Sequence, residues 1–494
     1  MNSIMTYTWI GFTVFLSAMF ILGLVSAKKT KNIRDFAIGS GLGPYVLGLS
    51  FSATYLSAAT FLGYPGWSYD WGLSNLWLFL AIIGGGPIGV IMVAKKARKL
   101  NQQQQSLSLP DWLGDFYNSD ILRVGSGIIL LFNVFYIAGQ FVAGARIFEY
   151  LLDIPYTMGL VAIAVIVVFY VFAGGALADI YTDAVQAVMM AFGGIAIFIS
   201  GIVLFWQGSI TNTFLGITEN LASQNKNLVK IFNPESTHFH SFITVLGAIM
   251  IQWAFASAPH LFNKILGLKD EKDLGKMIIT YILASFFSLV VLFGGFYSRR
   301  VLGDTVVTSD VALIDYVVWA FPAIFVAIFG VVILAAAMST TDGLFVSIAT
   351  VFSNDIFLKV LIKRKMIRVG KQKAERIAFW ISRITVPVTG LFAFFLVIRP
   401  PAYMGDIMWI GISGVAAGTM GPILYAIYGK QKAPARAAEA SMFAGLLSYL
   451  TLSFGGFIQS TMLAGSVATV IGIMTIAILA YILKPSAQPG YNEQ

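Results

Sequence analysis

The chain contains no cysteine, only three histidines, and few charged residues for its length of 494. The absence of cysteine excludes a disulfide framework, thiol chemistry and any cysteine-ligated metal site. Charged residues make up 11% of the sequence, whereas a soluble protein carries about 25%. Hydrophobic residues make up 58%, and the mean hydropathy is +0.81. This composition indicates an all-α polytopic membrane protein, and because no P-loop or catalytic triad pattern occurs, we do not expect an enzyme.

Thirteen apolar runs of roughly 18 or more residues are long enough to cross a bilayer. They cover residues 5–27, 43–66, 73–94, 122–146, 156–175, 178–206, 241–266, 277–298, 318–348, 377–398, 404–428, 437–455 and 461–483. With the N-terminus outside, 25 lysines and arginines fall on the inner side and six on the outer side. Because basic residues concentrate in cytoplasmic loops, this distribution predicts a cytoplasmic C-terminus. The net charge of +9 is then a topology signal with some attraction to anionic lipid, which argues against a nucleic-acid partner.

The spans also suggest an internal symmetry. Spans two to six and spans seven to eleven form two sets of five, and an odd number of spans reverses the orientation of the next set. We therefore expect an inverted repeat, with its first copy at 43–206 and its second at 241–428. One extra N-terminal helix at 5–27 and two trailing helices at 437–483 complete a single transmembrane domain over 1–494.

The second span has an unusual composition. It carries Ser52, Thr54, Ser57 and Thr60, followed by the Gly-Tyr-Pro-Gly sequence at 63–66. In hydrocarbon every backbone N–H and C=O must be satisfied, so a broken helix is tolerated only where it lines a cavity or is buried in protein. Broken membrane helices offer free carbonyls and hydroxyls to ions and substrates. The sequence therefore predicts a broken span that builds a binding site.

The ninth span contains three consecutive hydroxyl residues followed by an acid, Asp342. Because residues three and four apart share a helix face, the Ala336 carbonyl and the hydroxyls of Ser339 and Thr340 form one oxygen cluster. Two carbonyls from the broken span would give about five oxygen ligands for a hard cation. Alternatively, these hydroxyls bond back to carbonyls of their own helix and pack against a neighbour.

The sixth span places Asp179, Asp183 and Gln186 on one helix face near its inner end. Acids within a membrane are candidates for functional sites. The alternative is an acid at a helix start that faces the macrodipole, which fits Asp179 better than Asp183, one turn deeper.

The histidines give weaker signals. His238 and His240 lie beside Glu235 in a long outer loop and could bind zinc, although such an exposed pair is more often without a metal. His260 follows Pro259 near the inner end of the seventh span, where we expect a structural hydrogen bond.

Four motifs follow one another along the chain. They are Ala-Thr-Tyr-Leu-Ser-Ala-Ala-Thr-Phe-Leu-Gly at 53–63, Ile-Tyr-Thr-Asp at 180–183, Ala-Pro-His at 258–260 and Ala-Ala-Met-Ser-Thr at 336–340. As an ordered set they resemble the sodium/solute symporter family over essentially the whole chain. The resemblance implies a LeuT-like core of five plus five helices in a multi-pass plasma-membrane transporter, which we expect to work as a monomer.

The resemblance also implies a sodium site between the first and eighth core helices. Its ligands would be the carbonyls of Ala53, Leu56 and Ala336 and the hydroxyls of Ser339 and Thr340. This is the oxygen cluster that the helix geometry indicates.

A second site is implied by the position of Asp183. It matches an acid near the inner exit of the ion, which in some members helps bind a second sodium. The other ligands there are hydroxyl residues, but this sequence has Asp342 and Gly343 instead. Asp183 and Asp342 are therefore candidates for a second cation site or a proton site.

We predict that four residues contact the substrate: Tyr55, Ser57, Thr60 and Trp253. Proline-type members carry an acid where this chain has Tyr55, and sugar-type members carry an amide where it has Thr60. The pattern Tyr-x-Ser-Ala-x-Ser/Thr-Phe-x-Gly looks more like the pantothenate- and acetate-type members, which implies a small organic carboxylate.

The sequence therefore predicts a sodium-coupled symporter that works by alternating access. Within transport, the alternative is proton coupling with Asp342 or Asp183 as the carrier. Outside transport, the alternative is a channel or receptor on the same scaffold.

Overall fold

A computed structural model of the chain describes residues 2–27, 37–38, 41–174, 176–255, 258–306 and 308–483. These residues form helices, with one isolated β-bridge between Leu42 and Leu268. The first helices are α1 (Asn2–Ala27), α3 (Pro44–Tyr55), α4 (Ala58–Phe61), α5 (Gly63–Trp71), α6 (Leu76–Leu80), α7 (Gly86–Gln104), α8 (Leu109–Tyr117), α9 (Asp120–Ile129), α10 (Asn133–Leu152), α11 (Tyr156–Gly174) and α12 (Ala176–Leu204).

The second half of the chain is built in the same way. Its helices are α13 (Ile210–Gln224), α14 (Phe242–Phe255), α15 (Pro259–Gly267), α16 (Leu274–Leu289), α17 (Phe293–Leu302), α18 (Ala312–Ala320), α19 (Ala323–Thr350), α20 (Lys371–Leu396), α21 (Met404–Tyr428), α22 (Ala435–Tyr449) and α23 (Thr461–Ile482). Short 3-10 or π-helical segments join some of them: η1 (Gly72–Asn75), η2 (Ala81–Gly85), η3 (Leu130–Phe132), η4 (Lys226–Val229), η5 (Glu271–Asp273), η6 (Val290–Leu292), η7 (Ser309–Val311), η8 (Val351–Ile362) and η9 (Leu450–Phe454).

Across the described ranges, ten helical stretches are long and apolar enough to cross a membrane, or up to eleven if α14 and α15 form one bent span. The chain is therefore a multi-pass, all-helical membrane protein, but the predicted number of thirteen spans is not confirmed. α3 is too short to count because it has only 12 residues. The second and third predicted spans do not correspond to two separate helical stretches, because the stretch after the break runs on over Ala58–Gln104. The apolar part of α11, Tyr156–Phe172, is also too short.

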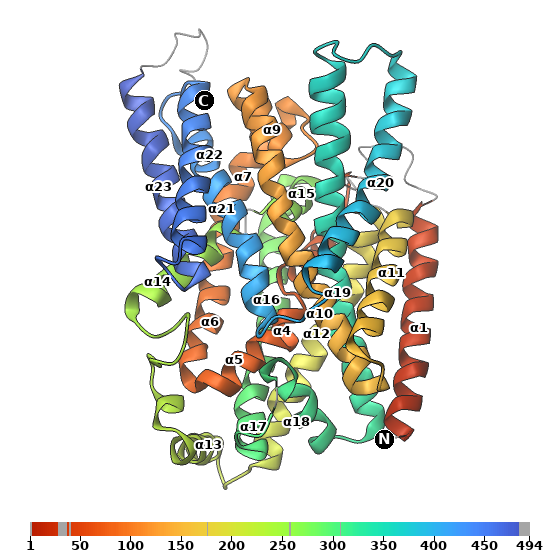
Figure 1. Cartoon of the computed structure of the whole chain (residues 1–494), viewed down its shortest axis with the longest axis vertical. Coiled ribbons are helices and arrows are strands. Elements are labelled where there is room, and N and C mark those ends of the chain that lie inside the picture. Colours follow the sequence, from red (N-terminus) through yellow and green to blue (C-terminus); the bar gives the residue numbers. More distant parts are fainter. Residues whose placement is uncertain are drawn as a thin grey trace.

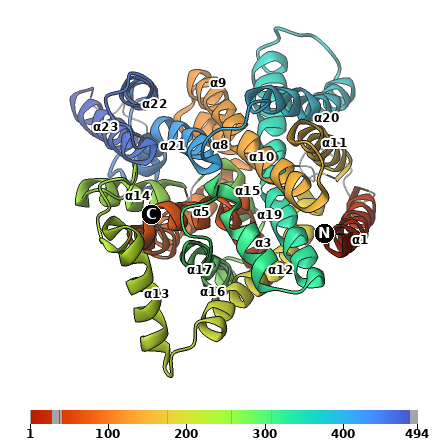
Figure 2. The same ribbon diagram turned by 60° about the horizontal axis from the view of Figure 1, so that its bottom comes forward.

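The helices that matter for function meet in the middle of the bundle. α3 and α19 pack against each other, and each also packs against α12 and α15 (Figure 2). α1 lies at one edge and α22 and α23 at another, and α1 begins at the bottom of Figure 1 whereas α23 ends at the top. α19 is buried over almost its whole length, because small residues such as those at 335–337 let neighbouring helices approach closely.

Five of the basic residues assigned to the inner side lie outside the described residues. They are Lys28, Lys29, Lys31, Arg34 and Lys484.

Candidate cation and substrate site

The second predicted span is broken, as the sequence indicates. α3 ends at Tyr55, and Leu56 and Ser57 have extended backbone angles before α4 begins. Ser57 caps α4, because its hydroxyl accepts the N–H of Ala59 at 3.2 Å. Ala58 donates its N–H to Oε1 of the buried Gln140 at 3.1 Å. The interruption is therefore stabilised by side chains, in agreement with the rule that backbone groups at membrane depth must find partners.

An oxygen cluster joins this break to α19. Ser339 Oγ lies 3.0 Å from the carbonyl oxygen of Ala53 and 3.1 Å from that of Ala336. Thr340 Oγ1 donates to the carbonyl of Thr54 at 3.2 Å. All five residues are buried. The structure therefore brings together four of the five predicted sodium ligands, with Thr54 in addition.

Two residues of this region behave differently. Leu56 lies in the break, but no hydrogen bond joins its carbonyl to α19 in the described part of the chain. Thr341 Oγ1 donates to the carbonyl of Ala337 at 2.5 Å, within its own helix. For Thr341 the alternative of back-bonding is therefore correct, whereas Ser339 also reaches across to α3.

A second polar cluster surrounds Asp183 of α12. Its Oδ2 accepts hydrogen bonds from Ser50 at 3.1 Å and from Thr54 at 2.7 Å. The same oxygen contacts Nζ of Lys264, which also binds Asp179 Oδ2 at 2.8 Å. From the sequence, Lys264 is predicted only to be one of the basic residues on the inner side. The signal for its role is a lysine within the apolar end of the seventh span.

Asp342 lies beside this cluster, on α19. It is 1% exposed, and both of its carboxylate oxygens lack a hydrogen-bond partner among the described residues. The nearby acids Asp179 and Asp183 would repel an ionised Asp342, whereas Lys264 would attract it. Next to it, a Cβ added at Gly343 would lie 3.4 Å from the Thr54 side chain. Asp342 is therefore available to a cation or a proton, while position 343 supplies no hydroxyl.

The predicted substrate residues are only partly brought together. Thr60 is fully buried, and its hydroxyl has no partner in the described part of the chain. Tyr136 of α10 interacts with the side chains of Ser57 and Thr340, which places Ser57 beside the cation cluster. Tyr55 is directed elsewhere, because its hydroxyl donates to Oε1 of Gln252 at 2.7 Å.

Trp253 is also directed elsewhere. Its indole N–H donates to the sulfur of Met92 on α7 at 3.0 Å. None of its described contacts is with Ser57 or Thr60. Gln140 and Tyr136 lie nearer to these two residues, and periodicity within an apolar helix gave no reason to select them.

The histidines are not arranged for zinc. His238 is buried and bonds Asp406 Oδ1 and Ser460 Oγ, both at 2.9 Å, whereas Glu235 bonds asparagines. Within the described ranges, no three His, Asp or Glu side chains form a metal site. His260 is buried, and neither ring nitrogen has a hydrogen-bond partner among the described residues. The prediction of a structural hydrogen bond at His260 is therefore wrong; its ring packs against Tyr136 and Phe255 instead.

Two acids connect segments that are far apart in the sequence: Asp310 is buried, and Asp70, within the stretch Ala58–Gln104, is partly buried. Asp70 accepts from Ser309 Oγ at 2.5 Å and from the Tyr403 hydroxyl at 2.8 Å. Asp310 of η7 accepts the N–H of Met404 at 2.8 Å. Burial raises the pKa of Asp310 to about 7, although the Met404 N–H opposes this shift. These contacts tie α5, η7 and the start of α21 together.

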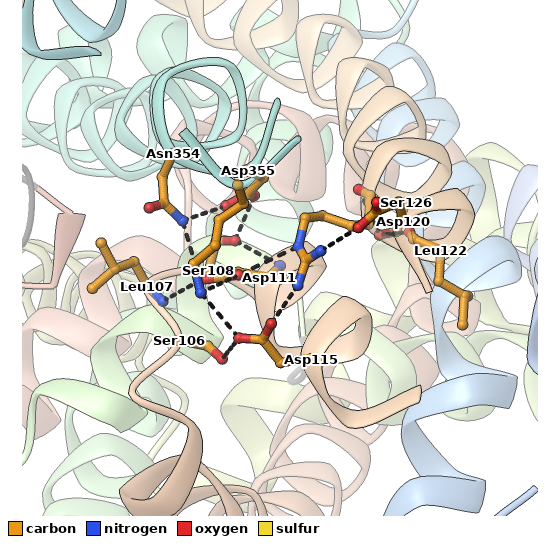
Figure 3. A network of polar contacts seen from close by, with 12 residues as sticks. Ser106, Leu107, Ser108, Asp111, Asp115, Asp120, Leu122, Ser126, Asn354 and Asp355 are labelled. Carbon is orange, nitrogen blue, oxygen red and sulfur yellow. Dashed lines mark hydrogen bonds and ion pairs between the residues drawn. The ribbon is translucent and has the colours of Figure 1, made fainter. Parts of the chain in front are cut away.

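A network that the sequence did not indicate ties α8 and α9 to η8, the continuation of α19 (Figure 3). Its centre is Arg123, which pairs with three aspartates: Asp111, Asp115 and Asp120. Lys359 of η8 lies 3.3 Å from Asp111 and 3.2 Å from Asp115. The hydroxyl of Ser108 donates to Asp355 at 2.6 Å. The only signal in the sequence is that Asp111 and Asp115 lie one helical turn apart.

Comparison with known proteins places this geometry in a family. The model of the sodium:solute symporter family matches residues 36–445. The chain is 27% identical to the sodium/pantothenate symporter of Haemophilus influenzae, covering 90% of this chain and 89% of that protein. It is also 27% identical to the osmoregulated proline transporter OpuE of Bacillus subtilis (91% and 89%) and 25% identical to the sodium/proline symporter of Escherichia coli (99% and 97%).

Solved structures show the same fold. A Na+-coupled sialic acid symporter in a substrate-bound, outward-open state superimposes with a TM-score of 0.78 at 18% identity, over 98% of this chain and 99% of that one. The nucleobase-cation-symport-1 family transporter Mhp1, in a closed conformation, gives a TM-score of 0.54 at 14% identity, over 90% and 94%.

Proposed function

Because this chain belongs to the sodium:solute symporter family, and is thus a transporter and not an enzyme, we propose that it imports a small organic carboxylate with sodium by alternating access. Members of the family named above are sodium-coupled symporters of small solutes.

The contact between Ser339 and two carbonyls, those of Ala53 and Ala336, carries the proposal. We assign sodium to this cluster, with Thr340 and the carbonyl of Leu56 completing its ligands. Oxygen-only ligand sets suit hard cations such as sodium. Because the ligands come from both α3 with its break and α19, sodium binds best when these two segments are close together. A ligand shifts a conformational equilibrium only by preferring one state, so this preference couples the ion to the transport cycle.

The substrate is placed beside the ion. Thr60 supports this position because its buried hydroxyl lacks a partner in the described part of the chain, which is costly unless a ligand supplies one. Ser57 lies within the same stretch, and Tyr55 and Trp253 would line the path at greater distance. Pantothenate, proline and sialic acid, which the relatives named above transport or bind, all carry a carboxylate group. This shared chemistry favours a carboxylate for this chain as well.

The topology is proposed on the same basis. The surplus of basic residues on one side supports an N-terminus outside and a C-terminus in the cytoplasm. The breaks after α3 and between α14 and α15 support two repeats, at 43–206 and 241–428. We place the protein in the cell membrane as a monomeric unit with one extra helix before the repeats and two after them.

The energetics limit what one sodium can do. An inside-negative potential of 100 mV supplies about 2.3 kcal/mol per charge, and a tenfold sodium gradient adds about 1.4 kcal/mol. One sodium could therefore hold a neutral solute roughly 500-fold concentrated. With a monoanionic carboxylate the charges cancel, and only about tenfold accumulation survives. A second coupling cation at Asp183 or Asp342 would raise this limit.

The surroundings of Asp342 support one alternative function, proton-coupled transport. A buried carboxylate with no hydrogen-bond partner must either hold a proton or pair with a cation. A symporter driven by protons through Asp342, with Asp183 as its neighbour, would use the same scaffold.

Uptake into proteoliposomes tests both candidates. Purified protein is assayed with a panel of small carboxylates and neutral analogues under an inward gradient of sodium, of potassium, or of protons alone. We expect concentrative uptake of a carboxylate under the sodium gradient only. Uptake driven by protons without sodium would favour the alternative, and no carboxylate uptake under any gradient would refute the substrate class.

A further inference from the structure

A buried lysine joins three helices at the centre of the bundle. Lys264 lies on α15, and its side chain is 3% exposed. Its Nζ donates to Ser50 Oγ on α3 and to Asp179 Oδ2 on α12, both at 2.8 Å. It also contacts Asp183 Oδ2 on α12. Two carboxylates and a hydroxyl therefore hold one ammonium group at a point where α3, α12 and α15 meet.

The oxygens around this ammonium are those that a free cation would bind. Asp183 Oδ2 accepts the hydroxyls of Ser50 and Thr54 in addition to the ammonium. Carboxylate and hydroxyl oxygens are the ligands of hard cations. Thr54 connects this position to the proposed sodium site, because its hydroxyl binds Asp183 while its carbonyl accepts from Thr340.

We propose that the ammonium of Lys264 is a built-in cation that fills a second cation position at Asp183, so that each cycle uses one sodium. This inference rests on the proposed function and deepens it. Buried charges are stable only when paired and hydrogen-bonded, and the two carboxylates meet that requirement for Lys264. The ammonium is part of the same chain, so its effective concentration at Asp183 is high. It therefore competes well with free sodium for this position.

The unused acid oxygens distinguish this role from that of a structural ion pair. Oδ1 of Asp179, Oδ1 of Asp183 and both oxygens of Asp342 are buried without hydrogen-bond partners in the described part of the chain. If the ammonium is removed, these oxygens remain as a negatively charged, partly preformed site. A second sodium would then restore the balance of charge. A structural pair would instead cost stability when broken and leave the number of bound ions unchanged.

The test counts sodium ions bound to the purified, full-length protein without substrate, by equilibrium dialysis with radioactive sodium. We expect one ion per chain for the wild type and two for Lys264→Met, which keeps an unbranched side chain one atom shorter and removes its charge. The sodium Hill coefficient of uptake cannot exceed the number of coupled sodium sites. It should therefore be about one in the wild type and rise towards about two in this variant.

Two control variants isolate the charge. Lys264→Arg retains a cation and should bind one sodium. The double variant Lys264→Met with Asp183→Asn removes the ammonium and its main acid together, and should return to one sodium.

Three results would overturn the inference. Two sodium ions per wild-type chain would show that Lys264 does not fill a cation position, and this count decides even if Lys264→Met does not fold. One sodium in folded Lys264→Met would make Lys264 a structural residue. Two sodium ions in the double variant would place the extra ion away from Asp183. A wild type that binds no sodium would contradict the proposed function itself, and is thereby distinguishable from failure of this inference alone.

Discussion

Replacing Ser339 by alanine removes the hydroxyl that connects the break in α3 to α19. Ser339 is fully buried, and its Oγ lies 3.0 Å from the Ala53 carbonyl and 3.1 Å from the Ala336 carbonyl. If sodium sits among these oxygens, the alanine variant loses one ligand and leaves the remaining carbonyls less well satisfied. Loss of one partner in a dry site costs about 1–3 kcal/mol. Since about 1.4 kcal/mol corresponds to a factor of ten, the sodium concentration for half-maximal uptake should rise roughly 5- to 150-fold.

The assay measures initial uptake rates in proteoliposomes over a range of sodium concentrations, with choline keeping the ionic strength constant. Thr340→Ala should give a shift of the same kind, because Thr340 reaches the Thr54 carbonyl on α3. Thr341→Ala is the matched control: it lies next in the same helix, but its hydroxyl bonds back to Ala337. We expect the sodium dependence of this control to be unchanged.

Two outcomes would refute the reasoning. Unchanged sodium dependence in both Ser339→Ala and Thr340→Ala would remove the ion from this cluster. An equal shift in Thr341→Ala would show that the effect comes from α19 as a whole and not from the ligands.

Four further predictions follow from the geometry. Thr60→Ala should weaken substrate affinity more than sodium affinity measured without substrate, and the opposite order in binding measurements would move Thr60 to the ion site. Asp342→Asn should abolish the pH dependence of uptake and leave the sodium Hill coefficient near one; a lowered coefficient would instead assign Asp342 to a second sodium. The raised pKa of Asp310, about 7, means that its protonated form stabilises the fold and that this contribution is lost as pH rises through 7. The wild-type melting temperature should therefore fall between about pH 4 and pH 7 and level off above pH 7, and Asp310→Asn should flatten that decline; identical slopes would contradict the argument. Arg123→Ala leaves three carboxylates without their buried partner and should destabilise by about 3–5 kcal/mol, whereas Lys359→Ala, at a partly exposed position, should cost about 1 kcal/mol or less. Equal melting temperatures for these two variants would count against the network.

The broken span and the hydroxyl cluster of α19 could be predicted because their composition is costly in hydrocarbon. Hydroxyls next to Gly and Pro have no place in a lipid-facing helix, and helix periodicity alone puts Ala336, Ser339 and Thr340 on one face. In the structure, Ser339 and Thr340 of this face donate to the carbonyls of Ala53 and Thr54 on α3.

The polar contacts between distant helices could not be predicted, because they depend on how the helices pack, and a single sequence does not reveal this. Lys264 pairs with acids 81 and 85 residues away, and Arg123 meets Lys359 across a shared set of aspartates. Such pairings follow from tertiary contacts between α12 and α15 or between α8 and η8, and no local pattern encodes them. Trp253, which we predict to contact the substrate, instead donates its indole N–H to the sulfur of Met92.

The span count differed for a similar reason. Hydropathy treats 43–66 and 73–94 as separate runs, whereas the helix breaks at Leu56 and then continues through Gln104. Because the break is set by Ser57 and Gln140, which cap the new helix from two different elements, its position lies outside what hydropathy can detect.

Coupled flux is the most direct test of the central claim, that sodium bound between α3 and α19 drives the solute. In proteoliposomes with the membrane potential clamped, radioactive sodium and a transported carboxylate are counted in the same vesicles. We predict that adding the carboxylate outside accelerates sodium entry, that the two enter in a fixed ratio, and that the Ser339→Ala, Thr340→Ala double variant loses both fluxes at low sodium. Entry of the carboxylate with no accompanying sodium, or full coupled flux in the double variant, would contradict the account.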